Sequence, residues 1–233
     1  MENTHQPTTV LKLDEGQEEQ CFKLWDTPIV LCKPFDKAFM AQLKKDVEPI
    51  VKGPGQFNHT DIWALPDLPD TLIAVRDKII ELGEKYYRPY CETPMSPFRI
   101  SKGYFRETKP GAYRMSPHKH SFIYGVSCLY IEADPRNPGN LTLMDPRGGV
   151  TWLNQFSPYK RIPVEEGLLV IHPGYVLHYV EPTDYDRPVY DYRLALISGL
   201  TRHYNEFLQA LKENETTFQS FGANGMPPMS SQN

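Results

Sequence analysis

Two histidine-containing stretches are the part of this chain best equipped to do chemistry. The first holds His118 and His120 in a His-x-His pair, and the second is an apolar run that leads to His178. If the pair lies on a strand, both imidazoles project from one face, because side chains alternate with a period of two. Two such imidazoles can take neighbouring positions on one metal ion, and His178 can supply a third. The pattern therefore predicts a metal site.

The elements that must position these histidines are β-strands of the C-terminal half. Five runs rich in β-branched and aromatic residues are separated by turns that contain Pro, Gly and Asp. The expected strands cover 100–107, 122–132, 140–144, 167–172 and 192–197. Short strands with metal ligands at their ends favour an antiparallel barrel or jelly roll.

The N-terminal half is expected to add one interrupted strand, over 22–32, and helices that pack on the outside of the sheet. Asp36 is a good N-cap for the first helix, Pro49 is expected to end it, and Asp70 is expected to cap the second. The expected helices are 37–48, 70–87 and a final one near 202–212. Their apolar residues fall on one face, as they do in helices that cover a core.

One domain is expected, over residues 21–215. Residues 1–20 are polar and acidic without periodicity, and 216–233 are rich in Gly, Pro, Ser and Asn, so both ends are expected to be loose. The whole chain has 233 residues, which is enough for a core that needs no disulfides.

Charge and cysteine usage narrow the class of protein. The formal net charge of -4 is spread without blocks, so nucleic acid is not an expected partner. The four cysteines have no metal-binding spacing and are expected to be reduced thiols; they are Cys21, Cys32, Cys91 and Cys128. The first residues do not resemble a secretion signal, and no apolar run is long enough to span a membrane. A cytoplasmic protein is expected.

An ordered set of motifs resembles the iron(II)- and 2-oxoglutarate-dependent oxygenases, in particular a branch found in phages and marine bacteria. The motifs are a His-x-His, a Gly-Val strand, a Gly-x-Leu strand that leads to Asp-Pro-Arg, a Gly-Leu-Leu strand that leads to a distal His, and an Arg. They occupy 113–120, 124–131, 139–147, 163–182 and 193–198. With the opening at 24–29, the resemblance covers about residues 23–200.

The resemblance implies a double-stranded β-helix (a jelly-roll, cupin-like barrel that is mainly β, with flanking helices) and a bound Fe(II). His118 matches the first iron ligand of the family and His178 the distal one, and both would be catalytic. His120 stands where the family has a carboxylate. Three ligand sets therefore remain open: three histidines, two histidines with a carboxylate such as Asp145, or two histidines with water. In its Asp-Pro-Arg context Asp145 also fits a turn.

Arg193 lies in an otherwise apolar strand. A buried guanidinium needs an anion, and its planar fork suits a carboxylate. The resemblance implies that Arg193 binds the distal carboxylate of the co-substrate 2-oxoglutarate, with the Ser198 hydroxyl as a helper. The alternative is an internal ion pair with a nearby acid; the candidates are Glu181, Asp186 and Asp191.

The resemblance implies a dioxygenase that uses molecular oxygen and releases succinate and CO2, most simply a hydroxylase. Loops at 56–63, 151–161 and 182–192 combine aromatic side chains with charges such as Lys160 and suit a small polar molecule or a peptide side chain. The chain is also a candidate homodimer. Two other classes remain: a cupin metalloenzyme, either a dioxygenase or an isomerase that does not use 2-oxoglutarate, and a non-catalytic β-barrel that binds a ligand. Metal content would separate the non-catalytic barrel from the enzymes, and succinate formation would separate the oxygenase from the cupin.

Overall fold

A computed structural model describes most of the first two hundred residues. The described ranges are 9–13, 16–24, 27–52, 61–90, 97–108, 117–120, 123–133, 139–147, 159–180 and 193–201. The chain divides into two compact units, residues 1–201 and 202–233. The second unit lies outside the described residues, as do the helix expected near 202–212 and the domain end expected at 215, so both stay predictions.

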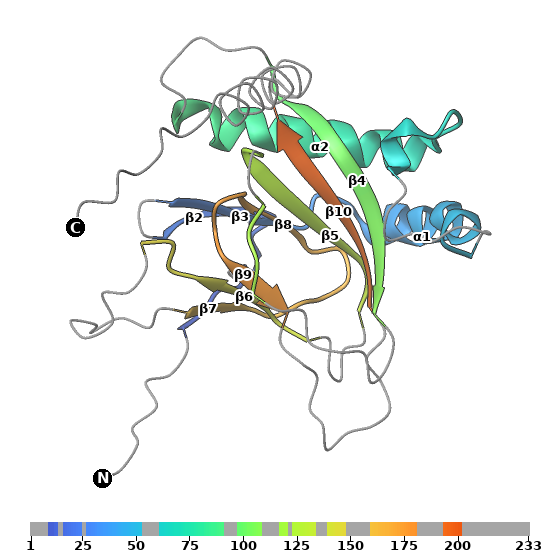
Figure 1. Cartoon of the computed structure of the whole chain (residues 1–233). Helices are drawn as coiled ribbons and strands as arrows, with labels where there is room; N and C mark the ends of the chain where they lie inside the picture. Colours follow the sequence, from blue (N-terminus) through green and yellow to red (C-terminus); the bar gives the residue numbers. More distant parts are fainter. Residues whose placement is uncertain are drawn as a thin grey trace, which may run out of the picture. The chain divides into compact units, whose positions relative to one another are not determined.

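Two β-sheets form the first unit. The six-stranded sheet has the order β2-β3-β8-β5-β10-β4 and the four-stranded sheet the order β1-β7-β6-β9. The strands are β1 (Thr9–Val10), β2 (Glu19–Leu24), β3 (Thr27–Cys32), β4 (Arg99–Thr108), β5 (Gly125–Ala133), β6 (Leu141–Met144), β7 (Tyr159–Ile162), β8 (Leu169–Pro173), β9 (His178–Val180) and β10 (Arg193–Thr201). From β5 onward the chain passes back and forth between the facing sheets (Figure 1), which confirms the expected double-stranded β-helix.

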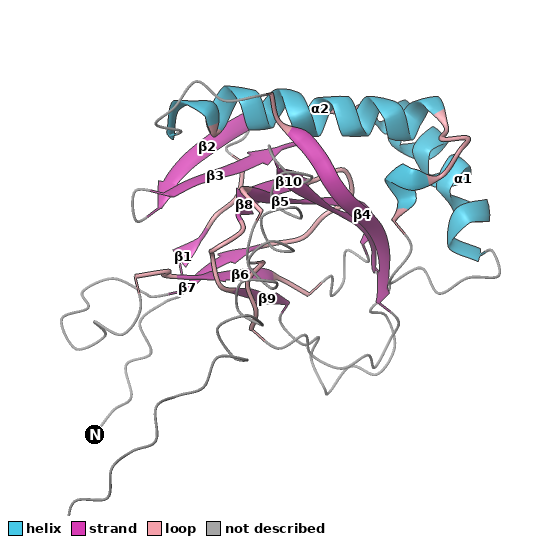
Figure 2. Cartoon of the chain, turned by 45° about the horizontal axis from the view of Figure 1, so that its top comes forward, coloured by secondary structure: helices cyan, strands magenta, loops and turns pink. Residues whose placement is uncertain are grey.

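Two helices cover the outer face of the six-stranded sheet (Figure 2). They are α1 (Lys37–Lys52) and α2 (Asp70–Tyr86), and the short 3₁₀ turns η1 (Ile62–Ala64) and η2 (Arg88–Tyr90) flank α2 in sequence. Leu43 of α1 and Ile79 of α2 are fully buried in one core with Leu129 of β5 and Leu169 of β8. Burial of such side chains contributes about 1.5–3 kcal/mol each and fixes the helices to the sheet.

A second core fills the space between the sheets. Ile29 and Leu31 of β3 and Val170 of β8 meet Leu143 of β6 and Ile162 of β7, all with no exposed surface. Alternate residues of the six-stranded sheet therefore face the helices or the barrel interior, as the period of two requires. The interior-facing positions of both sheets enclose the site.

The N-terminal arm differs from the expectation. Thr9 and Val10 form a parallel pair with Lys160 and Arg161, and the Leu11 amide donates to the Arg161 carbonyl at 2.8 Å. The reason is the apolar side chain of Leu11, which is only 6% exposed and packs in the core between the sheets. Residues 9–11, and 19–20 at the start of β2, are therefore paired in sheets and do not belong to a loose arm.

The sequence misplaced the end of α1 and the capping residue of α2. Asp36 caps α1 as expected, since its carboxylate accepts from the Phe39 amide at 2.8 Å, but α1 continues past Pro49 to Lys52. The apolar residues after Pro49 pack against the core between the helices and the six-stranded sheet. This burial offsets the helical hydrogen bond that Pro49 cannot donate. Asp70 is the first residue of α2; the residue before it, Pro69, makes no side-chain cap. Its negative charge still suits the positive end of the helix dipole.

The expected strands all exist, with ends shifted by a few residues, but β1, β7 and β9 were not predicted. The three described cysteines, Cys21, Cys32 and Cys128, are free thiols as expected, and Cys91 lies outside the described residues. A search of the described helices for a membrane-spanning one, with enough length and apolar character, found none.

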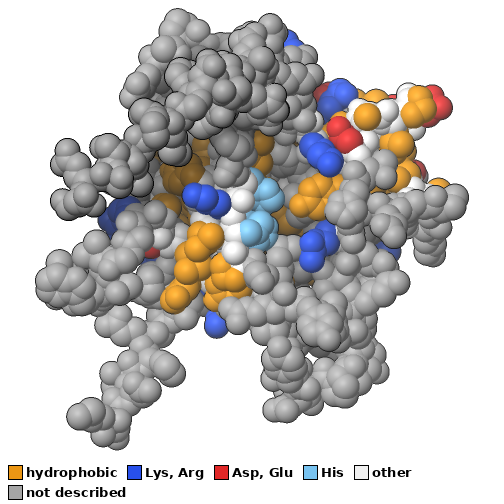
Figure 3. Space-filling view, viewed as in Figure 1, with side chains coloured by type: hydrophobic (Ala, Val, Ile, Leu, Met, Phe, Trp, Pro, Cys, Tyr) orange, Lys and Arg blue, Asp and Glu red, His pale blue; other side chains and the backbone are white. Residues whose placement is uncertain are grey.

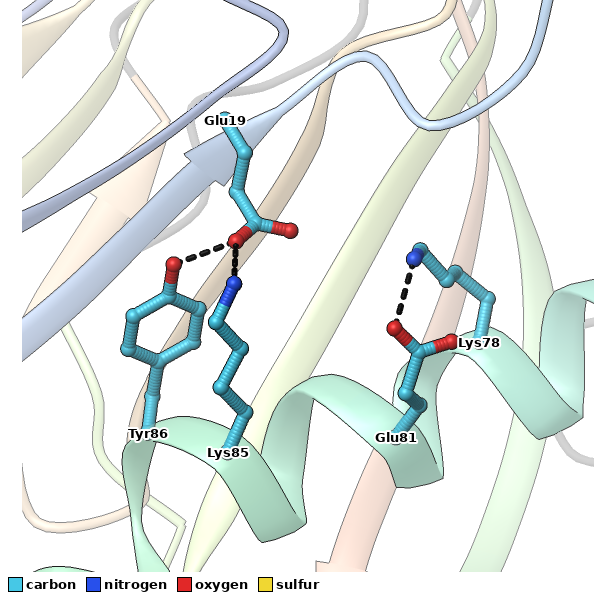
Figure 4. A network of polar contacts seen from close by, with 5 residues as sticks. All are labelled: Glu19, Lys78, Glu81, Lys85 and Tyr86. Carbon is cyan, nitrogen blue, oxygen red and sulfur yellow. Dashed lines mark hydrogen bonds and ion pairs between the residues drawn. The ribbon is translucent and has the colours of Figure 1, made fainter.

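A polar network fastens α2 to the edge of the six-stranded sheet (Figure 4). The carboxylate of Glu19 in β2 accepts from the Lys85 ammonium at 2.6 Å and from the Tyr86 hydroxyl. Burial raises the pKa of the Glu19 carboxyl, but the two hydrogen bonds outweigh burial and hold it below its usual value. The contact therefore depends on an ionised Glu19.

Candidate metal centre

The backbone places His118 directly beside His178. The His118 amide donates to the His178 carbonyl and the His178 amide to the His118 carbonyl, each at 2.9 Å. His178 opens β9, whereas His118 forms an isolated bridge and is not in a described strand. Because the two residues exchange both hydrogen bonds, their side chains project from the same face. The ring centroids are 4.4 Å apart.

A separate backbone contact positions His120. Its amide donates to the Gly174 carbonyl at 2.8 Å, in the turn between β8 and β9. A Cβ atom at Gly174 would lie 2.3 Å from the Ile123 carbonyl oxygen and 2.6 Å from that of His120. Only glycine allows the two backbone segments to approach so closely, and this brings the His120 ring to 5.2 Å from the ring of His178.

The three imidazoles converge as the sequence predicted. One ring nitrogen of each lies within 4.8 Å of the others, a spacing at which a single ion could contact all three; the residues are His118, His120 and His178. Within the described residues this group contains no carboxylate. Figure 3 shows histidine side chains visible from one side of the molecule, among hydrophobic side chains and with Lys or Arg side chains nearby.

Local contacts prepare His178 to act as a ligand. Its Nδ1 lies 3.0 Å from the Val176 carbonyl, which can only accept, so Nδ1 carries the proton and Nε2 keeps a free lone pair. Burial, followed by the nearby His172, lowers the pKa of His178 to about 2. Burial and the neighbouring His118 also lower the pKa of His120. Both rings are therefore neutral at pH 7, as metal ligation requires.

A fourth histidine packs against the cluster. His172 of β8 is 1% exposed and its ring lies 4.4 Å from that of His178. Its Nδ1 donates to the Pro173 carbonyl at 3.0 Å. Burial lowers its pKa to about 4, so it is also neutral. His172 is not part of the three-residue group and acts as packing beneath His178.

Asp145, the alternative carboxylate, has another role. Its side chain accepts from the Arg147 amide at 3.0 Å and from the Arg147 guanidinium at 2.7 Å. The hydrogen bonds with Arg147 hold the pKa of its carboxyl below the usual value. Asp145 therefore closes the Asp-Pro-Arg turn, and it is not in the histidine group.

The strand register gives different partners to the two residues expected to bind 2-oxoglutarate. Arg193 lies opposite Ala133, which belongs to the core between the sheets. Ser198 lies opposite Gly103, whose α-carbon faces Trp63 on the helix-covered side. The side chains of Arg193 and Ser198 lie outside the part of the structure that is described, so the expectation that Ser198 assists Arg193 stays a prediction.

Two further residues share the barrel interior: Tyr130, which the sequence reasoning did not assign to the site, and Lys160, which it expected in a loop that contacts substrate. Tyr130 lies opposite Ala195, which is two residues after Arg193 in β10. Its side chain is 1% exposed and packs in the core between the two sheets. Lys160 lies opposite Leu143, which lies opposite His178. The alternation of β5 and of β7 is the signal that could have identified them. Most of the loops expected to contact substrate, at 56–60, 151–158 and 182–192, lie outside the described residues.

Comparisons with known proteins identify the fold. No protein-family model and no curated protein sequence matches the chain. Among solved structures it is similar to an oxidoreductase of the 2OG-Fe(II) oxygenase family from Burkholderia pseudomallei, with 10% identity, a TM-score of 0.55, and coverage of 85% of this chain and 97% of that one.

Two further solved structures are similar to the chain in fold. The carbocyclase SnoK from nogalamycin biosynthesis, described as non-heme and alpha-ketoglutarate dependent, has 11% identity, a TM-score of 0.55, and coverage of 75% and 79%. A prolyl-4-hydroxylase from Pseudomonas putida has 13% identity, a TM-score of 0.51, and coverage of 80% and 94%. The chain has the double-stranded β-helix fold of the 2OG-Fe(II) oxygenases, and three of its histidines converge.

Proposed function

We propose that this protein is an Fe(II)- and 2-oxoglutarate-dependent oxygenase that hydroxylates a small polar molecule or a peptide side chain. The observation that carries the proposal is the convergence of three ring nitrogens within 4.8 Å on a barrel of the oxygenase fold. When bound there, Fe(II) would supply oxygen activation coupled to the conversion of 2-oxoglutarate to succinate and CO2.

The residues present fit a divalent ion of this kind. Imidazole nitrogens are ligands for Fe as well as for Zn, Cu and Ni, and three of them leave coordination positions open for a co-substrate. His178 offers Nε2 because its Nδ1 is fixed by the Val176 carbonyl. His118 and His120 complete the set, since Asp145 is held by Arg147.

The co-substrate would extend from the metal into the barrel. Arg193 would bind its distal carboxylate, because the residue opposite it, Ala133, belongs to the core between the sheets. Tyr130 is a further candidate to assist Arg193 beside Ser198, since it lies opposite Ala195, two residues from Arg193, and belongs to the core between the sheets. A charge-assisted hydrogen bond contributes roughly 1.5–3 kcal/mol, so Arg193→Ala should weaken 2-oxoglutarate binding by roughly ten- to a hundredfold.

A cupin metalloenzyme that does not use 2-oxoglutarate is the second candidate, and the absence of a carboxylate from the described histidine group favours it. Oxygen-dependent formation of succinate by the Fe(II)-loaded protein separates the two. Wild type should form succinate, and His178→Ala should not. Arg193→Lys should recover part of the activity lost in Arg193→Ala, because it keeps the charge and loses the planar fork. Metal-bound wild type that never consumes 2-oxoglutarate would favour the cupin.

A further inference from the structure

Lys160 is a cation on the same cross-strand row as the histidine cluster. It lies opposite Leu143, and Leu143 lies opposite His178. Residues opposite one another project from one face, and Leu143 is fully buried between the sheets. The Lys160 side chain therefore enters the barrel interior. Neighbouring strands are about 4.8 Å apart, which puts the α-carbons of Lys160 and His178 about 10 Å apart.

The Lys160 ammonium has no hydrogen bond or ion pair within the described part of the chain. Some other lysines of the described residues are paired, such as Lys33 with Glu165 at 2.9 Å and Lys44 with Glu132 at 2.7 Å. Lys160 is half-buried, and burial lowers the pKa of its ammonium. A partly desolvated charge without a partner is unfavourable, so an anion beside Lys160 would stabilise it.

The neutral donor set of the metal centre increases this need for an anion. Three imidazoles leave the full charge of a divalent ion uncompensated, whereas a carboxylate ligand would remove one unit. The ion and Lys160 carry three positive charges and 2-oxoglutarate two negative charges. One positive charge remains even before Arg193 is counted, so the occupied barrel attracts a further anion.

We propose that Lys160 binds an anionic group of the primary substrate, which makes the substrate a small organic acid or phosphate ester. The inference rests on the proposed oxygenase function and deepens it. The distal carboxylate of 2-oxoglutarate is the other anion within the barrel, and Arg193 is the residue assigned to it. Binding of co-substrate and of anion must therefore be measured separately.

The test uses the Mn(II)-loaded protein under anaerobic conditions, saturated with 2-oxoglutarate and titrated calorimetrically with acetate and with inorganic phosphate. Lys160→Met keeps the length and removes the charge, and Lys160→Arg keeps the charge. Lys45→Met removes an exposed lysine of α1 and is the matched control. Thermal melting checks that each variant is folded.

Wild type, Lys45→Met and, more weakly, Lys160→Arg should bind at least one of the two probes. Lys160→Met should bind it roughly ten- to a hundredfold more weakly, with 2-oxoglutarate affinity unchanged. Equal probe affinity in wild type and Lys160→Met, or no probe binding by wild type, overturns the proposal. A loss of 2-oxoglutarate affinity in Lys160→Met also overturns it, because Lys160 then holds the co-substrate.

Failure of the proposed oxygenase function gives a different result, since wild type would then not bind 2-oxoglutarate at all. The two probes can still be titrated into the Mn(II)-loaded protein, where the difference between wild type and Lys160→Met tests the anion site alone.

Discussion

Replacing Gly174 by alanine should displace His120 and weaken metal binding. The new Cβ atom would lie 2.3 Å from the Ile123 carbonyl oxygen and 2.6 Å from the His120 carbonyl oxygen. Both oxygens belong to the backbone, so no side-chain rotation relieves the contact. Gly174 also accepts from the His120 amide at 2.8 Å and donates to the Tyr124 carbonyl at 3.1 Å, and a shift strains both hydrogen bonds.

The magnitude follows from these contacts. Overpacking costs about 1–3 kcal/mol, and each lost hydrogen bond about 0.5–1.5 kcal/mol. Gly174→Ala should therefore lower the free energy of unfolding by about 2–6 kcal/mol. Residues that orient a metal ligand typically change metal affinity by about 10–100-fold when substituted, and the same loss is expected here.

Urea unfolding of the metal-free protein and calorimetric titration of Mn(II) measure the two effects. Gly83→Ala is the control, because a Cβ atom there meets flexible Leu200 methyl groups at 3.3 Å and lies in a helix, where alanine is favoured over glycine by up to about 1 kcal/mol. In a His120→Ala background, Gly174→Ala should change Mn(II) affinity little further, because coupled residues are not additive. Equal Mn(II) affinity of Gly174→Ala and wild type would refute the reasoning.

Three other predictions concern stability. Because burial lowers the folded-state pKa of His172 to about 4, the unfolded state binds more protons between about pH 6.5 and 4, and the metal-free protein should lose stability as pH falls through this window. His172→Phe should flatten that slope by up to about 1.4 kcal/mol per pH unit in urea unfolding, and an unchanged slope would contradict it. The pKa of Glu19 is lowered in the folded state, so its contribution to stability is fully present above about pH 4.3 and is lost as pH falls through the lower folded-state pKa. Glu19→Gln should remove this acid-dependent part of the stability in thermal melts. An acid profile like that of wild type would argue against the network. Leu43→Ala should cost about 2–5 kcal/mol in urea unfolding, because Leu43 is fully buried beneath α1, and a loss below about 1 kcal/mol would show that the site collapses around the cavity.

The barrel could be predicted because its signals are local. The runs around β5 and β8 alternate or remain apolar over five or more residues, and turns with Pro, Gly or Asp separate them. The stripes of α1 and α2 likewise follow from helical periodicity, since α2 buries residues three or four positions apart, such as Leu72, Val75 and Ile79. These features need no knowledge of distant contacts.

The missed elements depend on partners far along the chain. β9 has three residues and β7 reads Tyr-Lys-Arg-Ile, so neither shows a pattern by itself. β1 exists because its backbone pairs with β7 and because the Leu11 side chain packs in the core between the two sheets. Tertiary pairing creates all three strands.

The candidate site was predicted in outline and misread in detail. His118 and His120 share the cluster, but a backbone bridge to His178 and a contact with Gly174 bring them there, and no described strand contains the pair. The expected role of Ser198 beside Arg193 stays a prediction, because the side chains of both residues lie outside the described part of the structure. Whether the histidines bind metal, and the role of Arg193, stay predictions.

A crystal structure of the protein soaked anaerobically with Fe(II) and 2-oxoglutarate would test the central claim most directly. One ion should lie between His118, His120 and His178, with nitrogen–metal distances of about 2.0–2.2 Å, the range for imidazole on a comparable divalent ion. 2-oxoglutarate should chelate that ion and reach Arg193 with its distal carboxylate. An ion held elsewhere, or these histidines without metal under saturating Fe(II), would contradict the account.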